Sequence, residues 1–371
     1  MKTFNEIIQQ RYSRAKEWKE NNQKEVIGWF CIYVPEEIIT AAGMLPFRII
    51  GQESETPMAN AYLYSNNCTF ARSCLEEVLQ GKLDFLSGAV ICNSCDHIRR
   101  LYDVWRKYIT IPYRHLLGVP GKVSPNTLRY FKGQLLQLKE GLEQYFKVRI
   151  TEEGLKEAIR LYNYNRTLLN RLYALRRAIP SPISGREAME VVLAGMFIPK
   201  ELHNQLLEEL LTQLEQQPDN SPQAPKPRIL LMGSELDHPE YVKIIEDQGV
   251  EIVIEDLCSS YRYFADLVEE DGDPIEALTR RYLTRLPCPR MHPAEPRMER
   301  LKELAQLYNI NGVVYSTIKF CDLHAGAYPI VRDNFKELGV PVLHLEREYG
   351  LAGMGQVKTR VQAFLEMLRE G

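Results

Sequence analysis

Short apolar segments alternate with helical patterns along the first 120 residues of the chain. Four of these segments are strand candidates, because they are too short and too uniformly apolar to be amphipathic helices. They cover residues 26–34, 45–51, 85–92 and, more weakly, 109–117, and helices are predicted at 36–42, 69–80 and 97–108. Strands that alternate with helices predict a parallel, doubly wound α/β sheet.

Residues 122–216 follow a different pattern. Apolar side chains recur there at spacings of three and four, which predicts a long helix with one apolar face; these are Leu128, Phe131, Leu135, Leu138, Leu142 and Tyr145. A second helix is predicted from 152 to about 177. Ser184 and Glu187 have the spacing of a capping box, so a third helix should begin there. We predict that this block is a helical insertion or lid.

A proline-rich and polar segment at residues 217–227 has the composition of a linker. Beyond it the alternation of strands and helices returns. Strands are predicted at 228–233, 251–256, 312–318 and 340–345, with helices near 238–248, 295–308, 325–338 and 357–369. The sequence therefore predicts two α/β domains, an N-terminal domain at 1–216 that includes the insertion and a C-terminal domain at 228–371.

Composition and charge exclude several classes of function. The net charge of -3 argues against a nucleic-acid-binding protein, which usually carries a basic excess. No apolar run approaches the roughly 18 residues of a membrane span, and the polar start is unlike a secretory signal. We therefore expect a cytoplasmic protein. No glycine-rich phosphate loop follows a first strand, so a nucleotide site is not expected in this chain.

The chain has eight cysteines, and in a reducing cytosol they should not form structural disulfides. Either burial or metal binding must explain them. Cys95 and Cys321 are each followed by an aspartate and lie between a predicted strand and a predicted helix. Cys258 follows its strand in the same way. In open α/β sheets this end of the strands is where ligands bind, which favours a role in binding.

Three further cysteines also lie near predicted loops or helix starts. Cys68 and Cys74 flank the start of the helix predicted at 69–80, and Cys288 lies between two prolines. Zinc sites usually contain paired CxxC motifs, whereas Cys92 and Cys95 form the only such spacing here. Thiols from distant strand ends favour an iron–sulfur cluster in a cleft between the domains. Inert thiols that pack in the core are the alternative.

Six segments of the sequence are similar to one known family. Residues 28–51, 67–76, 93–105, 318–326, 340–350 and 355–368 resemble, in this order, the 2-hydroxyacyl-CoA dehydratase and benzoyl-CoA reductase family. The resemblance implies two α/β domains with an oxygen-sensitive cluster between them. It also implies that Cys68, Cys95 and Cys321 hold a [4Fe–4S] cluster. A separate iron–sulfur activator would hydrolyse ATP and supply a low-potential electron in an anaerobic cell.

The family contains three kinds of protein that this chain could represent. In the dehydratases two related subunits pair, and an electron converts an acyl-CoA thioester carbonyl into a ketyl radical before water is lost. In benzoyl-CoA reductases the electron enters an aromatic ring. In the double-cubane proteins a homodimer carries [8Fe–9S] clusters and reduces small molecules.

The number of available thiols favours one of these kinds. One cubane needs three protein thiolates, whereas two bridged cubanes need about six. Cys74, Cys258 and Cys288 together with the three matched cysteines make six, so we favour a homodimeric double-cubane reductase. A [4Fe–4S] subunit of a dehydratase or of a benzoyl-CoA reductase is the alternative. An electron carrier without chemistry of its own is a further one.

Two residues outside the cysteines are candidates for catalysis. Glu37 follows Pro35 and could offer a carboxylate, although we expect Glu36 and Glu37 to be solvated acids of a first helical turn. His97 follows Cys95 and could tune a cluster or pass protons, or it could simply cap a helix. Arg99 and Arg100 are expected to form surface ion pairs or to contact an anionic partner.

Overall fold

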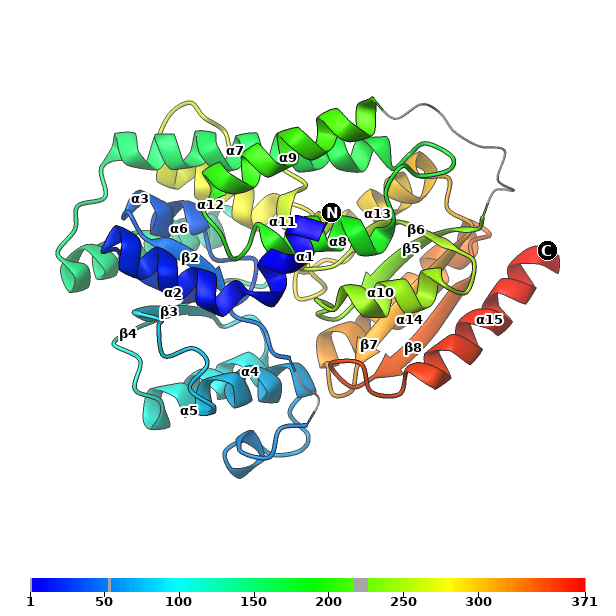
Figure 1. The fold of residues 1–371 in the computed structure, drawn as a ribbon, viewed down its shortest axis with the longest axis horizontal. Coiled ribbons are helices and arrows are strands. Elements are labelled where there is room, and N and C mark those ends of the chain that lie inside the picture. The colour runs from blue at the N-terminus through cyan, green and yellow to red at the C-terminus, as the bar shows by residue number, and fades with distance from the viewer. Residues whose placement is uncertain (1, 53–54, 217–225, 371) are drawn as a thin grey trace.

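The computed structural model describes residues 2–52, 55–216 and 226–370 of the chain. It contains two four-stranded sheets, and every strand pair in both is parallel (Figure 1). The first sheet has the spatial order β2 (Leu45–Arg48), β1 (Val26–Trp29), β3 (Gly88–Cys92) and β4 (Tyr113–Leu117). The second has the order β6 (Glu251–Asp256), β5 (Arg228–Gly233), β7 (Gly312–Ile318) and β8 (Val342–Arg347). The predicted α/β fold with two parallel, doubly wound sheets is confirmed.

Both sheets have the same topology. The chain starts each sheet at an inner strand, β1 or β5, continues to the edge strand beside it, and then crosses to the other side. The strand order therefore reverses between β1 and β3 in the first sheet and between β5 and β7 in the second. In open α/β sheets such a switch point opens a crevice at the carboxyl ends of the strands, where ligands bind.

Several helices accompany the first sheet. They are α1 (Lys2–Gln9), α2 (Arg11–Asn22), α3 (Glu36–Ala41), α4 (Thr69–Leu79) and α5 (Asp96–Tyr108), with a 3₁₀ turn η1 (Ala59–Ala61). The strand predicted at 26–34 is shorter than expected and ends at Trp29. Cys31 has a φ of 68°, a left-handed conformation that a strand does not permit, so the chain turns before α3 begins.

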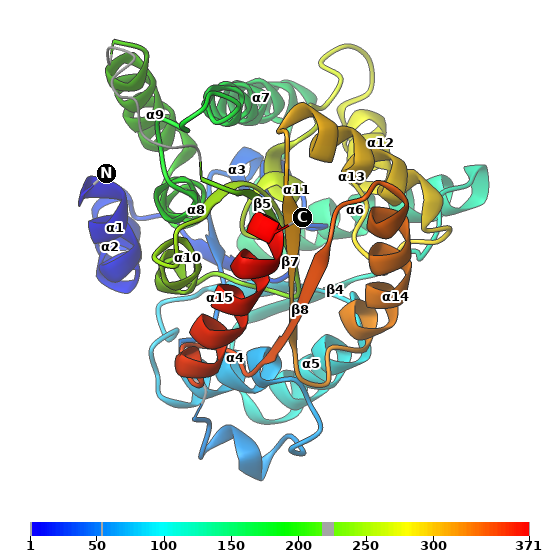
Figure 2. The same cartoon turned by 90° about the vertical axis from the view of Figure 1, so that its right-hand side faces the viewer.

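Helices cover both faces of the second sheet. Figure 2 shows α10 (Pro239–Glu246) and α15 (Met354–Glu370) on one side of the strands, with α13 (Glu295–Leu307) and α14 (Asp322–Glu337) on the other. Two further helices, α11 (Tyr261–Phe264) and α12 (Pro274–Thr284), were not predicted from the sequence. None of the described helices combines the length and the apolar character needed to cross a membrane.

The predicted helical insertion is present, but it connects the two sheets. It contains α6 (Pro125–Phe146), α7 (Glu152–Leu175), α8 (Gly185–Ala194) and α9 (Lys200–Glu215), and α7 and α9 run along the top of Figure 1. The predicted capping box is confirmed, because the Ser184 N–H donates to the Glu187 carboxylate at 3.0 Å and the Glu187 N–H donates to the Ser184 hydroxyl at 3.2 Å. Helix α7 packs against α3 and α12, and α8 packs against β6 and α10.

The predicted division into two domains at 1–216 and 228–371 stays a prediction. Most of the predicted linker, residues 217–225, lies outside the described residues. One sheet lies on each side of this segment in the sequence. The packing of α8 against the second sheet means that the helical block belongs to both halves of the molecule.

The carboxyl ends of the two sheets face each other. Arg48, the last residue of β2, forms an ion pair of 3.2 Å with Glu235, which follows β5. The Tyr349 hydroxyl, beyond β8, lies 2.7 Å from the Asp237 carboxylate and 3.1 Å from the Gly51 carbonyl oxygen. Residues that follow strands of one sheet therefore contact residues that follow strands of the other, and a site between the sheets can draw on both.

Candidate cysteine site between the two sheets

Three of the predicted site residues lie at the start of a helix. Cys68 precedes α4, Cys95 precedes α5 and Cys321 precedes α14, each in the N-cap position. These helices follow β2, β3 and β7, so two of the thiols come from the first sheet and one from the second. A helix N-terminus stabilises a thiolate, because unpaired N–H groups and the helix dipole favour negative charge there.

These three thiols, which we call the first trio, lie close enough to interact electrostatically. Burial raises the pKa of Cys68, and the charges of Cys321 and Cys95 raise it further. Burial also raises the pKa of Cys95 to about 12, and Cys321 again contributes. The structure thus brings together the three cysteines that the family resemblance selects.

His97 connects two of the helix starts in the first trio. The backbone N–H of Cys68 donates to Nδ1 of His97 at 3.2 Å, which joins the start of α4 to the start of α5. Burial lowers the pKa of His97, which favours the neutral ring that accepts this hydrogen bond. Of the roles considered for His97, this geometry corresponds to capping and positioning.

A second group of thiols, the second trio, consists of Cys31, Cys258 and Cys288. Cys31 follows β1, Cys258 follows β6, and Cys288 lies between α12 and α13. Burial raises the pKa of Cys258, and the charges of Cys288 and Cys31 add to the effect. The two trios adjoin, because Cys31 also acts on the pKa of Cys95, and Cys288 acts on that of Cys321.

Sequence reasoning missed Cys31 as a site residue. A hydrogen bond from the Cys92 thiol lowers the pKa of Cys31 to about 6, and Arg48 and Arg290 act in the same direction. The signal that could have identified Cys31 is its position, because it follows the first strand of a doubly wound sheet. Its apolar neighbours hid this signal by making the strand seem longer.

The expected placement of Cys74 is wrong. We predicted that it lies at a loop or helix start, but α4 begins at Thr69 and Cys74 lies inside the helix, fully buried. Burial raises the pKa of Cys74, and its strongest charged neighbours are Asp237 and Arg48. Iron binding by Cys74 stays a prediction, while Cys31 occupies the position beside Cys258 and Cys288.

An arginine fixes the segment that carries Cys288. The guanidinium of Arg290 donates to the carbonyl oxygens of Ser94 at 3.0 Å, Pro120 at 2.8 Å and Val119 at 2.8 Å. Ser94 immediately precedes Cys95, so Arg290 holds Cys288 of the second trio beside Cys95 of the first. This contact also joins the two halves of the chain.

Glu36 and Glu37 are not solvated, contrary to the expectation from the sequence. Both are buried in α3, and the hydroxyls of Tyr263 and Tyr282 donate to them at 2.7 Å. Burial raises the pKa of Glu36. It acts in the same direction on Glu37, but Arg166, Arg281 and Tyr282 together outweigh it and lower the pKa of Glu37. These carboxylates therefore join α3 to α11 and α12. Arg100, in contrast, forms the expected exposed ion pairs with Asp96 and Asp103.

The sequence that carries these thiols is similar to that of a known family. A family model described as "2-hydroxyglutaryl-CoA dehydratase, D-component" matches residues 31–368, a range that includes all eight cysteines. The chain belongs to this family. The resemblance predicted from the six segments is therefore confirmed.

Curated members of the family are similar over nearly the whole chain. The β subunit of (R)-phenyllactyl-CoA dehydratase from Clostridium sporogenes is 26% identical, over 98% of this chain and 97% of its own length. A subunit of benzoyl-CoA reductase from Thauera aromatica is 28% identical, over 96% and 95%. The β subunit of (R)-2-hydroxyglutaryl-CoA dehydratase from Acidaminococcus fermentans is 25% identical, over 93% of each chain. All three are named as enzyme subunits.

The spacing of the thiols is relevant to the kind of metal site. Within the described part of the chain, no group of three or more His, Cys, Asp or Glu side chains could hold a single metal ion. Thiols that share one ion must crowd around it, whereas in a cubane each iron takes its own thiolate, so the ligands lie farther apart. The cysteines of each trio interact without surrounding a single point, which is compatible with the wider spacing of cubane ligands.

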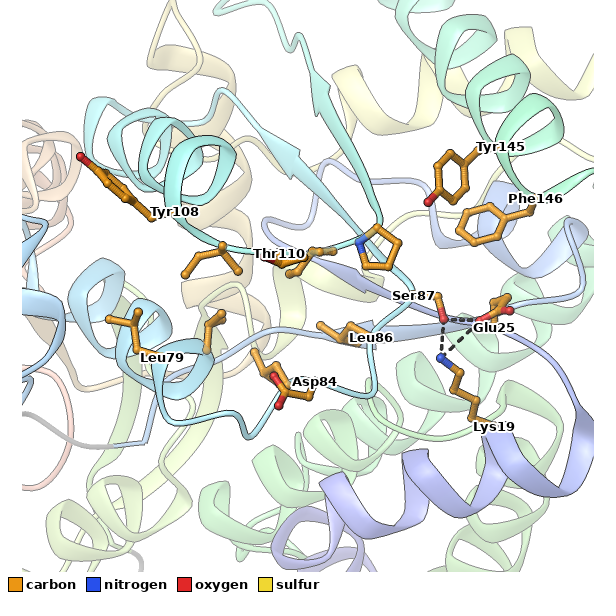
Figure 3. A pocket seen from close by; sticks show the side chains of 15 residues that line it. Lys19, Glu25, Leu79, Asp84, Leu86, Ser87, Tyr108, Thr110, Tyr145 and Phe146 are labelled. Atoms are coloured by element: carbon orange, nitrogen blue, oxygen red, sulfur yellow. Dashed lines mark hydrogen bonds and ion pairs between the residues drawn. The ribbon is translucent and has the colours of Figure 1, made fainter.

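The pocket drawn in Figure 3 lies at the opposite end of the first sheet. Its volume is about 680 Å³, and its lining includes Glu25, Ser87 and Pro112, which precede β1, β3 and β4. Lys19 donates to Ser87 at 2.7 Å and forms an ion pair with Glu25 at 3.3 Å on one side of the pocket. This pocket is therefore separate from the carboxyl ends of the strands, where the thiols lie.

Proposed function

We propose that this chain is an iron–sulfur redox subunit of the 2-hydroxyacyl-CoA dehydratase and benzoyl-CoA reductase family. One observation carries the proposal: two adjoining trios of thiols lie between the sheets, where the strand order of each sheet reverses. Thiolates are the usual protein ligands of iron–sulfur clusters, so the donor set fits such a group. Cys68, Cys95 and Cys321 would hold it in the first trio.

We favour a double-cubane [8Fe–9S] cluster and therefore a homodimeric reductase of small molecules. Six thiols are available, and they fall into two sets of three, as two bridged cubanes require. Cys31, Cys258 and Cys288 would hold the second cubane, so Cys31 replaces Cys74 in the set of six predicted from the sequence. The second candidate is a [4Fe–4S] subunit of a dehydratase or a benzoyl-CoA reductase, paired with a homologous subunit and acting on an acyl-CoA. The names of the relatives favour this candidate.

When bound, such a cluster supplies one-electron transfer at low potential. The residues of this chain would hold it in place and shield it. The N-termini of α4, α5 and α14 favour the thiolate forms of the first trio, and the burial of Cys68 limits the access of water. The electron would come from an ATP-hydrolysing iron–sulfur activator protein, so that ATP is used by this partner.

Counting iron after anaerobic purification tests the proposal. We expect about eight irons and nine sulfides per chain for the double cubane. Cys31→Ala should lower the iron content, whereas Cys74→Ala, a matched change at a buried cysteine, should preserve it. About four irons, unaffected by Cys31→Ala, would instead support the [4Fe–4S] subunit. A colourless, iron-free protein would support inert thiols.

Turnover separates an enzyme from an electron carrier. With the activator, ATP and a reductant present, a reductase should consume a small reducible substrate steadily. A carrier would take up a fixed number of electrons and then stop. Steady ATP-dependent turnover is the result that we expect.

A further inference from the structure

Buried arginines with unused hydrogen-bond donors lie around the second trio. Arg48, Arg262 and Arg285 are each at most 2% exposed. Among the described residues, Nη1 of Arg48, Nη1 of Arg262, and Nε and Nη2 of Arg285 have no hydrogen-bond partner. A buried donor without a partner is destabilising, and more so when it is charged, so these groups require an explanation.

All three guanidinium groups lie near the second trio, two of them as neighbours of Cys258 and the third through Tyr33. Cys258 is an electrostatic neighbour of both Arg48 and Arg262. The guanidinium of Arg285 lies 4.8 Å from the ring centre of Tyr33, which in turn has Cys288 and Cys31 as its neighbours. Unused guanidinium donors are therefore present beside the second trio.

The surroundings of the second trio carry an excess of positive charge. Arg48 is balanced by Glu235 at 3.2 Å, whereas Arg262 and Arg297 share the single carboxylate of Asp256. In the described chain, neither Arg285 nor Arg290 forms an ion pair with a carboxylate. The excess lies in a buried environment, where charges act more strongly than at the surface.

The first trio has different surroundings. In the first trio, Arg72 is the basic neighbour of Cys68. Arg72 is partly exposed, and its guanidinium donates to the Asn67 carbonyl at 3.1 Å and to the Asn60 side chain at 3.0 Å. Cys95 and Cys321 are partly exposed, as are Cys31, Cys258 and Cys288 of the second trio, so the two sides differ in their arginines rather than in the exposure of their thiols. Phe320, next to Cys321, is 50% exposed. The arginine beside the first trio is therefore partly exposed and already hydrogen-bonded, unlike those beside the second trio.

We infer that the two halves of the cluster site are electrostatically unequal, and that the half held by Cys31, Cys258 and Cys288 accepts the first electron. This inference rests on the proposed double cubane. The reduction potential of an iron–sulfur cluster depends on net charge, hydrogen bonds to the sulfurs and exposure to solvent. Buried arginines with free donors stabilise the more negative, reduced form.

A potentiometric titration followed by electron paramagnetic resonance tests this inference on the iron-loaded chain. We expect two separate one-electron steps. Arg285→Met should shift the first, higher-potential step to more negative potential and narrow the gap between the steps. Arg285→Lys keeps the charge and should restore most of the gap. Arg72→Met is the matched control at the first trio and should leave the first step in place.

Two ligand variants identify the half that is reduced first, even if Arg285→Met does not fold. Cys258→Ser should alter the signal of the first electron, and Cys321→Ser should alter that of the second. If Cys321→Ser changed the first signal and Cys258→Ser did not, the inference would be overturned. The same holds if Arg285→Met shifted both steps equally. About four irons in the unmodified chain would overturn the proposed double cubane itself, which separates the two failures.

Discussion

The carboxylate of Glu37 connects three helices from distant parts of the chain. Glu37 lies in α3, and it accepts hydrogen bonds from Arg166 in α7 and from Tyr282 in α12. Its side chain is fully buried, and that of Arg166 is only 6% exposed. Since α3 directly follows the turn that contains Cys31, this ion pair also supports the backbone of the candidate site.

Replacing Glu37 with glutamine leaves a buried guanidinium without its counter-charge. Removing one partner of a buried ion pair costs about 3–5 kcal/mol, because the remaining charge stays desolvated. The pKa of Glu37 is lowered in the folded chain, since Arg166, Arg281 and Tyr282 together outweigh the effect of burial. The stabilisation is therefore present at neutral pH and is lost as the pH falls below roughly 4.5 and through the lowered pKa of the folded state. The difference between the wild type and Glu37→Gln should shrink in acid.

Urea unfolding at pH 7, followed by both fluorescence and circular dichroism, measures the loss and reveals whether the transition is two-state. Glu152→Gln is a suitable control, because Glu152 lies in the first turn of α7, is 67% exposed and pairs with Lys156. That change should cost less than about 1 kcal/mol. Equal losses in the two variants would refute the reasoning. A stable Glu37→Gln protein that has lost turnover would instead make Glu37 a catalytic residue.

Three further changes have expected effects on stability. Gly233→Ala would place a Cβ atom 1.8 Å from the carbonyl oxygen of Ser316, at a φ of 141°. The free energy of unfolding, measured with urea, should therefore fall by about 3 kcal/mol or more. The Cβ atom of Gly326→Ala in α14 meets open space, so this change should stabilise the chain by up to about 1 kcal/mol. An equal fall in the free energy of unfolding in both glycine variants would contradict these two expectations. Burial, with Lys200, lowers the pKa of His203 to about 3, whereas the unfolded chain takes up this proton below about pH 6.5. Wild-type stability should therefore fall by about 2 kcal/mol more than that of His203→Gln between pH 6.5 and 5, and parallel pH curves would refute this.

The alternation of strands and helices could be predicted because central parallel strands are buried on both faces. Their apolar runs are therefore short, continuous and bounded by helices. The end of β1 could not be predicted in the same way. Phe30, Ile32, Tyr33 and Val34 are all buried, although the chain has already left the sheet. An apolar run predicts that its residues are buried, but it does not distinguish a strand from a buried turn that follows the strand.

The same distinction explains which cysteines were identified. Cys95, Cys258 and Cys321 follow apolar runs and precede helices, so their positions at strand ends could be predicted. Cys31 lies inside an apolar run and could not be separated from the strand. The helix predicted at 69–80 begins at Thr69 as α4 does, so Cys68 lies outside the helix and Cys74 within it.

Each trio takes thiols from both halves of the chain, and this has a consequence for assembly. Cys321 completes a trio begun by Cys68 and Cys95, and Cys31 completes one begun by Cys258 and Cys288. Neither trio is complete in a single sheet with its own helices. The contact of Arg48 with Glu235 and the hydrogen bonds of Arg290 join the two halves of the chain beside these trios. A cluster bound there would connect the two sheets, so its binding energy would add to the stability of their interface.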